Sequence, residues 1–190
     1  MPGRYLPIYA GDSKFPVHTP GIDLVLYILY GRRGSRPDRK GWGCRFEERI
    51  NTMGEEKRGL GIIFHSGTYD HIYQGIEIAL TALALGRRVR LFFSYWALEY
   101  LRRDTDPMKK IEKEPEYRQR IIMDGMENGN IKNFAELFSM LKQLGGKLYT
   151  CPGSMALLNM NKEELIDEVD EGMGLPVFLM KTENDQLLFV

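Results

Sequence analysis

From Gly59 onward, short apolar runs alternate with longer segments of helical periodicity, and this alternation limits the chain to a few architectures. Three runs are typical of strands buried on both faces: residues 60–64, 88–93 and 147–150. Between them, residues 69–85 and 133–144 place apolar side chains at every third or fourth position, as amphipathic helices do. Strands that alternate with helices predict a mainly parallel sheet with helices on both faces, joined by right-handed crossovers.

The C-terminal quarter of the chain completes the predicted sheet. We expect short helices from about Ser154 and over residues 162–170, then a fourth strand at 176–180. Asn184-Asp185 predicts a turn into a fifth strand at 186–190, which makes the last two strands an antiparallel edge pair. The expected fold class is therefore α/β, with three α/β/α layers around a mostly parallel five-stranded sheet.

The first 58 residues differ in composition from the rest. Prolines and glycines break up any long element there, and residues 31–41 form a basic loop. Residues 24–30 are the longest apolar run of this part and suit either a strand or a short buried helix. We expect residues 1–58 to be an extension, packed on the domain or on a neighbouring subunit, and residues 59–190 to be the α/β domain.

Charge and cysteine content narrow the class of protein. Lys and Arg number 26, as do Asp and Glu, so the formal net charge is zero and no strong attraction to nucleic acid is expected. No apolar run approaches the roughly 20 residues of a membrane-spanning helix, and we expect neither membrane association nor a signal peptide. Two cysteines do not make a secreted disulfide framework, so we expect a cytoplasmic protein with reduced thiols.

Cys151 is the residue to which the sequence most directly assigns chemistry. It ends the third expected strand and precedes Pro152, Gly153 and Ser154. Proline is favoured as the first residue of a helix, so Cys151 is expected at or near the N-cap. Unpaired N–H groups at a helix start stabilise an anion, and a thiolate held there is a better nucleophile or sulfur acceptor. The alternative is a small, buried, inert cysteine.

The end of the first strand adds a second set of candidate residues. Ligands of parallel α/β sheets bind beyond the carboxyl ends of the strands, so His65 is a candidate base or partner for Cys151. Ser66 and Gly67 are candidates for holding an anion at the following helix. The competing interpretation of His65 is a polar strand-end residue bonded to the backbone. His65, His71 and Cys151 lack the spacing of a metal site, and no metal or organic cofactor is expected.

Three stretches of sequence together are similar to one protein family. They are residues 61–70 (GIIFHSGTYD), residues 84–93 (ALGRRVRLFF), and residues 145–155 (GGKLYTCPGSM) followed by 162–165 (KEEL). In order and spacing they resemble the DsrE/DsrF-like family of sulfur-relay proteins, over about residues 59–190. The resemblance implies a flavodoxin-like α/β/α fold and assembly into homotrimers or hexamers.

For family members that keep the cysteine, the resemblance implies a persulfide at the position of Cys151. Such members accept sulfane sulfur, which we expect to come from thiosulfate, polysulfide or a protein persulfide, and pass it to a partner protein. The implied partners are thus sulfur donor and acceptor proteins. Two features depart from the family pattern: the extension to residue 58, and the lack of a second cysteine close after Cys151, which excludes a dithiol there.

Two alternatives stay open at the level of sequence. The chain could be a non-catalytic oligomeric subunit, in which Cys151 is incidental, or a small-ligand-binding module that uses the turn Ser66-Gly67-Thr68. Cys44, the other thiol, could form a disulfide with an oxidised Cys151, or it could be an unrelated cysteine in a loop.

Overall fold

The computed structural model describes residues 58–104, 107–129 and 131–190, so the expectations for the N-terminal extension and for Cys44 lie outside the described residues. Five strands form one sheet: β1 (Leu60–Phe64), β2 (Val89–Phe93), β3 (Lys147–Thr150), β4 (Glu171–Gly172) and β5 (Gln186–Phe189). Their order across the sheet is β4-β3-β2-β1-β5, and every neighbouring pair is parallel. The predicted five-stranded, mainly parallel sheet is confirmed.

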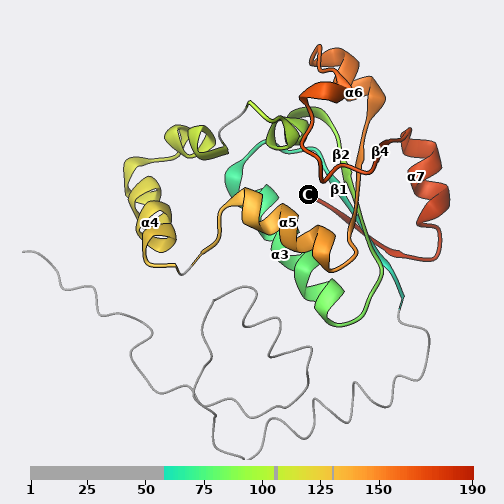
Figure 1. Ribbon diagram of the computed structural model, residues 1–190, viewed down its shortest axis with the longest axis horizontal. Helices are drawn as coiled ribbons and strands as arrows, with labels where there is room; N and C mark the ends of the chain where they lie inside the picture. The colour runs from blue at the N-terminus through green and yellow to red at the C-terminus, as the bar shows by residue number, and fades with distance from the viewer. Residues whose placement is uncertain (1–57, 105–106, 130) are drawn as a thin grey trace, which may run out of the picture.

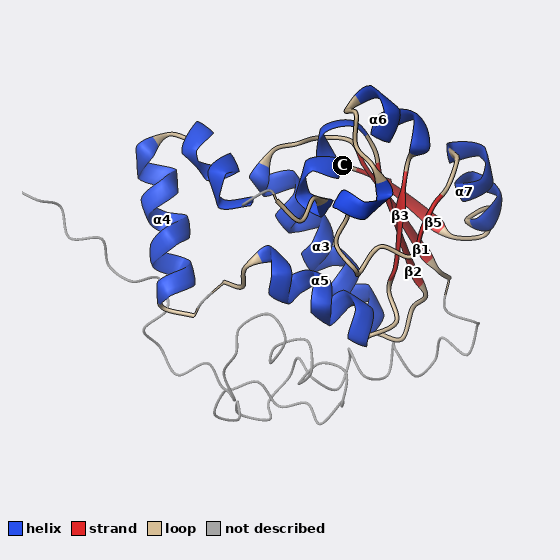
Figure 2. Ribbon diagram, turned by 45° about the horizontal axis from the view of Figure 1, so that its top comes forward, coloured by secondary structure: helices blue, strands red, loops and turns tan. Residues whose placement is uncertain are grey.

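Helices cover the two faces of the sheet unequally. Helices α3 (Tyr69–Ala84) and α5 (Phe134–Gln143) lie on one face, and α7 (Leu175–Lys181) lies on the other (Figures 1 and 2). Helix α4 (Glu116–Glu127) projects to one side of the sheet, and α6 (Pro152–Leu157) follows β3 directly. The other helical turns of the described residues are 3₁₀ helices: η1 (Tyr95–Leu101), η2 (Pro107–Lys113) and η3 (Lys162–Glu164).

The strand order explains why α7 lies on the opposite face from α3 and α5. From β1 to β4 the chain steps across the sheet in one direction, so right-handed crossovers place the connecting helices on one face. The chain then returns from β4, at one edge, to β5 at the other edge. A right-handed crossover in the reverse direction places its helix, α7, on the second face.

The main core lies between the sheet and the helices α3 and α5. Its fully buried members include Ile62, Phe64, Ile76, Leu91 and Leu141. A smaller cluster lies on the second face and contains Phe92, Tyr149, Met173 and Phe178. Phe178 is the one buried side chain of α7, so this helix covers the second face through a single aromatic anchor.

Two segments near the C-terminus correct the expectations from sequence. Residues 176–180 are not a strand but most of α7, so β5 pairs in parallel with β1 and there is no antiparallel edge pair. Pro176 stands in the first turn of α7, where its missing N–H costs nothing, and an apolar run this short has no period that separates strand from helix.

The prediction of a helix over residues 162–170 is also wrong, because only the single turn η3, residues 162–164, is helical. Leu165 is buried and pairs with Arg102 in an antiparallel bridge, and the N–H of Ile166 donates to the carbonyl of Leu101 at 2.9 Å. These contacts hold the segment extended.

The three layers match the expected α/β/α arrangement, whereas the strand order differs from the 2-1-3-4-5 order of flavodoxin.

Candidate functional site

The carboxyl ends of three adjacent strands bring candidate residues into one row. His65, Ser94 and Cys151 are the first residues after β1, β2 and β3. The N–H of Cys151 donates to the carbonyl of Phe93 at 2.9 Å, and the N–H of Ser94 donates to that of Phe64 at 2.9 Å. Ser94 is buried and its hydroxyl also donates to Phe64, so it fixes the middle of the row.

Cys151 is the N-cap residue of α6, as expected, with Pro152 at the start of the helix. Its carbonyl accepts from the N–H of Met155 at 2.9 Å, and its side chain makes no capping hydrogen bond. The sulfur is therefore not used to hold the helix. A Cβ at position 153 would lie 3.9 Å from Cys151 Sγ, so Gly153 leaves the helix side of the sulfur open.

The Cys151 side chain is half-buried and lies on the second face of the sheet. It packs against the cluster of Phe92, Tyr149, Met173 and Phe178, whereas Ser154, one turn into α6, is buried. One side of the sulfur thus has an apolar floor. The other side meets the start of α6, where the N–H groups of the first helical turn have no partner within the helix.

His65 is held by β5 rather than by β3. Its Nδ1 lies 2.8 Å from the main-chain oxygen of Val190, and its ring stacks on Phe189 with centroids 4.4 Å apart. Because that oxygen only accepts, Nδ1 is the donor and Nε2 is the ring nitrogen available to a ligand. β2 lies between β1 and β3, so about 10 Å separates the two strand ends. The structure does not bring His65 into contact with Cys151.

The turn after β1 makes its contacts within the fold. The Ser66 hydroxyl lies 3.1 Å from Thr68 Oγ1, and the Thr68 N–H donates to it at 3.3 Å. A Cβ on Gly67 would lie only 2.7 Å from the Cβ of Trp96, and Tyr100 donates its hydroxyl to the Gly67 carbonyl at 3.3 Å. Close packing against Trp96 therefore requires glycine at position 67. The sequence suggested a different reason for this glycine, an anion-binding turn.

The surroundings of this turn shift the pKa values of one carboxyl group, Asp70, and of two phenols, Tyr69 and Tyr100. A hydrogen bond with the Thr68 side chain, followed by one from the His71 N–H at 2.9 Å, lowers the pKa of Asp70 at the start of α3. Burial raises the pKa of Tyr69 and of Tyr100, which stay neutral phenols beneath the turn at any physiological pH. Of these three groups, only Asp70 carries a negative charge at neutral pH.

Two aromatic residues at the end of β2 were not among the candidates from sequence. Tyr95 and Trp96 are 53% and 54% exposed, next to the strand ends that precede His65 and Cys151. Tyr95 has a φ of 47°, a left-handed conformation that is rare for a bulky residue. The sequence carries a signal for them, because the triplet Ser94-Tyr95-Trp96 directly follows an apolar strand.

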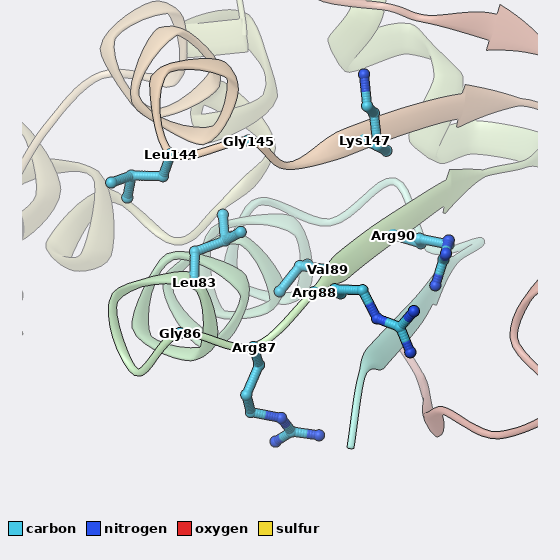
Figure 3. Close-up of a pocket in the computed structure, with 9 residues that line it drawn as sticks. All are labelled: Leu83, Gly86, Arg87, Arg88, Val89, Arg90, Leu144, Gly145 and Lys147. Carbon is cyan, nitrogen blue, oxygen red and sulfur yellow. The ribbon is translucent and has the colours of Figure 1, made fainter. Parts of the chain in front are cut away.

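A cavity of about 420 Å³ lies at the opposite end of the sheet, where β2 and β3 begin (Figure 3). Its four cations have partners within the fold: Arg87 donates to the carbonyls of residues 58 and 59, and Lys147 pairs with Asp170 at 2.9 Å. Arg90 and Arg88 both pair with Asp185, at 2.6 Å and 3.8 Å. Figure 3 shows Arg87 and Lys147 pointing in opposite directions. The cavity therefore offers no convergent set of free cations.

Two negative findings apply to the described part of the chain. No three His, Cys, Asp or Glu side chains within it are grouped so that they could hold a metal ion. No helix within it is both long enough and apolar enough to cross a membrane.

The fold and the site together define a small α/β protein with an all-parallel sheet and a half-exposed cysteine at the sheet's carboxyl edge. Residues 58–188 match the DsrE/DsrF-like family, and the chain belongs to that family. The resemblance found from sequence is confirmed.

Individual relatives are distant. The chain is 26% identical to the uncharacterized protein YrkE of Bacillus subtilis, over 73% of this chain and all of that protein. It is 23% identical to the sulfur carrier protein DsrE2 of Allochromatium vinosum, over 71% of this chain and 99% of that protein. The crystal structure of the ychN protein from E. coli superposes with a TM-score of 0.52 at 15% identity, covering 70% of this chain and 99% of that one, which shows a shared fold.

Proposed function

We propose that this protein is a sulfur carrier that takes sulfane sulfur on Cys151 and passes it to a partner protein. The observation that supports this most directly is the position of Cys151. It is half-exposed at the carboxyl end of β3, its sulfur makes no capping bond, and the chain belongs to a family with a distant relative named as a sulfur carrier. Ligands of parallel α/β sheets bind at this edge.

The proposed step is thiol exchange and needs no cofactor. The Cys151 thiolate attacks the outer sulfur of a donor persulfide, R–S–SH, so that a new S–S bond forms on Cys151 while the donor S–S bond breaks. The donor leaves as the thiolate R–S⁻, and Cys151 holds the persulfide. Attack by an acceptor thiolate on the outer sulfur then returns Cys151 to a thiolate, so electrons balance without an external oxidant.

We assign the remaining site residues to binding rather than to bond making. Pro152, Gly153 and Ser154 form the first turn of α6, and the N–H groups that such a turn leaves without a partner in the helix would stabilise the negative charge of a persulfide on Cys151. His65, Ser66 and Gly67 lie at the end of β1, where an incoming donor or acceptor would meet the His65 Nε2. Because the His65 ring is held by β5, we propose it as an accessory group, not as the base for Cys151.

Peptide-level mass spectrometry tests this proposal. The reduced protein is exposed briefly to thiosulfate, tetrathionate or polysulfide and is then analysed with and without added reductant. We expect a reducible sulfur adduct on Cys151. The matched variants are Cys44→Ser, which should keep the adduct, and Cys151→Ser, which should lose it although Cys44 remains.

Other outcomes distinguish the competing functions. A disulfide between Cys44 and Cys151 would indicate redox sensing instead of sulfur transfer. No adduct on either thiol, together with unchanged function of the Cys151→Ser variant in the host, would support a non-catalytic subunit or a ligand-binding module. The proposed homotrimer or hexamer is tested separately by sedimentation equilibrium of the full chain.

A further inference from the structure

The second face of the sheet carries large apolar side chains on α7 and β5 that the described residues leave more than 40% exposed. α7 anchors on this face through Phe178, whose ring lies 5.0 Å from that of Phe92. β5 lies at the sheet edge beyond β1, and its Leu187 and Phe189 are 46% and 66% exposed. A Cβ on Gly61 would meet Leu187 at 2.7 Å and Thr182 at 3.2 Å, so Leu187 lies on the same face as α7.

The helical geometry of α7 shows which of its side chains border β5. Lys181 pairs with Glu171 of β4 at 3.2 Å and lies over the Tyr149 ring of β3, so that side of α7 faces β3 and β4. At 100° per residue, Leu175 and Leu179 project to the other side, toward β1 and β5. Both are more than 40% exposed. We call the four side chains Leu175, Leu179, Leu187 and Phe189 the α7–β5 surface.

An exposed apolar surface along an edge strand is a liability that proteins usually cover. Here it also borders the candidate site, because Phe189 stacks on His65. The described chain begins beside this surface: Arg58 donates to the carbonyl of Asn184 at 3.1 Å, and the N–H of Gln186 donates to that of Gly59 at 2.9 Å. The N-terminal extension therefore enters the domain at the first residue of β5.

The extension contains one segment suited to covering the surface. Residues 24–30 (LVLYILY) are seven consecutive apolar residues, the longest such run in a region that prolines, glycines and charged residues otherwise interrupt. Residues 31–57 connect this segment to Arg58, and a connection of that length can span at most about 90 Å. β5, by contrast, is about 13 Å long. The connection thus reaches every part of the α7–β5 surface.

We propose that residues 24–30 bind the α7–β5 surface of their own chain. A tethered segment competes with a second molecule at an effective concentration in the millimolar range, which favours intramolecular binding over self-association. The segment then covers the open edge of the sheet next to His65. This inference does not depend on the proposed sulfur chemistry.

Hydroxyl-radical footprinting of the full chain tests the proposal. Phe189 reports on the surface, and Tyr117 of α4, which is 57% exposed, is the internal reference. The double variant Leu26→Asp with Ile28→Asp should increase the labelling of Phe189 relative to Tyr117 several-fold, because carboxylates cannot bind an apolar surface. The matched control, Thr19→Asp with Ser35→Asp, adds the same two carboxylates outside the segment and should leave the ratio unchanged.

A crosslinking arm covers the case in which the aspartate variant loses its fold. In a background of Cys44→Ser and Cys151→Ser, a Leu26→Cys and Leu187→Cys pair should form a disulfide within one chain. A Leu26→Cys and Ile121→Cys pair, the second on α4, should not. Equal Phe189 labelling in the unmodified chain and the aspartate variant would overturn the proposal. So would protection or crosslinks that appear only as protein concentration rises, which would identify a second copy as the occupant.

Discussion

Gly67 lies where the chain leaves β1 and passes close to the backbone of η1. A Cβ at this position would lie 2.7 Å from Trp96 Cβ and 3.3 Å from the Trp96 carbonyl oxygen, and backbone cannot move as a flexible side chain does. We expect Gly67→Ala to lower the free energy of unfolding by about 1–3 kcal/mol, because it overpacks a tight contact. The midpoint of urea unfolding, at unchanged slope, measures this loss.

Gly153→Ala is the matched control for that substitution. A Cβ on Gly153 meets only the sulfur of Cys151, at the ordinary contact distance of 3.9 Å, and alanine is favoured over glycine in a helix. Its urea midpoint should stay the same or rise. If both variants lost stability equally, close packing against Trp96 would not be the reason for glycine at position 67.

Individual site residues differ in how far sequence could place them. The N-cap position of Cys151 is confirmed, because a proline after a strand-ending residue is a local signal. The separation of His65 from Cys151 depends on β2 lying between β1 and β3, which no local pattern specifies. The left-handed backbone of Tyr95 was likewise not predictable, because a bulky residue rarely adopts a positive φ.

At the scale of elements, α7 shows why a short apolar run misleads. Residues 176–180 suit a strand by composition, and a seven-residue helix offers too few turns for a period to stand out. The long amphipathic helices α3 and α5 and the strands β1 and β3 were predicted with nearly the observed bounds. β4 was missed because it has only two residues, both exposed, and exists through its pairing with β3.

Asp170 links α5, β3 and the start of β4, so its substitution should lower the stability of the fold. Asp170 directly precedes β4. Its carboxylate accepts hydrogen bonds from Lys142 of α5 at 2.7 Å, from Lys147 of β3 at 2.9 Å and from the N–H of Leu148 at 2.9 Å. We expect Asp170→Asn to cost about 1–2 kcal/mol near neutral pH, since the bonds to both ammonium groups weaken. The exposed Asp167, paired with Arg103, is the control, and Asp167→Asn should cost about 0–1 kcal/mol.

The effect of Asp170 should also depend on pH. Partial burial acts to raise its pKa, but the hydrogen bonds from Lys142, Lys147 and Leu148 outweigh it and lower the pKa below the usual value. A carboxyl whose pKa is lowered by folding stabilises the fold above its unfolded pKa of about 4, and that contribution is lost as pH falls through the folded pKa. The difference in urea midpoint between the unmodified protein and Asp170→Asn should therefore shrink on acidification. A constant difference between pH 7 and pH 2 would contradict this account.

At the scale of the whole molecule, the two faces of the sheet differ in how many apolar side chains they bury. The face under α3 and α5 has a large core with many fully buried side chains, whereas the second face relies on α7 and its one buried phenylalanine. Right-handed crossovers explain this inequality, because three successive connections place their helices on one face and only the return to β5 uses the other. Cys151, His65 and the α7–β5 surface all lie where the covering is thinnest.

Stability should be equally uneven along the chain, and α4 gives the sharpest test. None of its twelve residues is buried, and only Ile122 and Met126 pack, half-buried, against the main core. A helix of this length is marginal in water by itself, so α4 should open locally while the sheet stays folded. In native-state hydrogen exchange, we expect its amides to exchange much faster than those of α3, with almost no dependence on added urea, whereas α3 amides should respond steeply because they open only with global unfolding. If α4 amides instead reached the same protection and the same urea dependence as α3, α4 would belong to the cooperative core, and its contacts through η2 and Ile131 would have to stabilise it far more than their burial indicates.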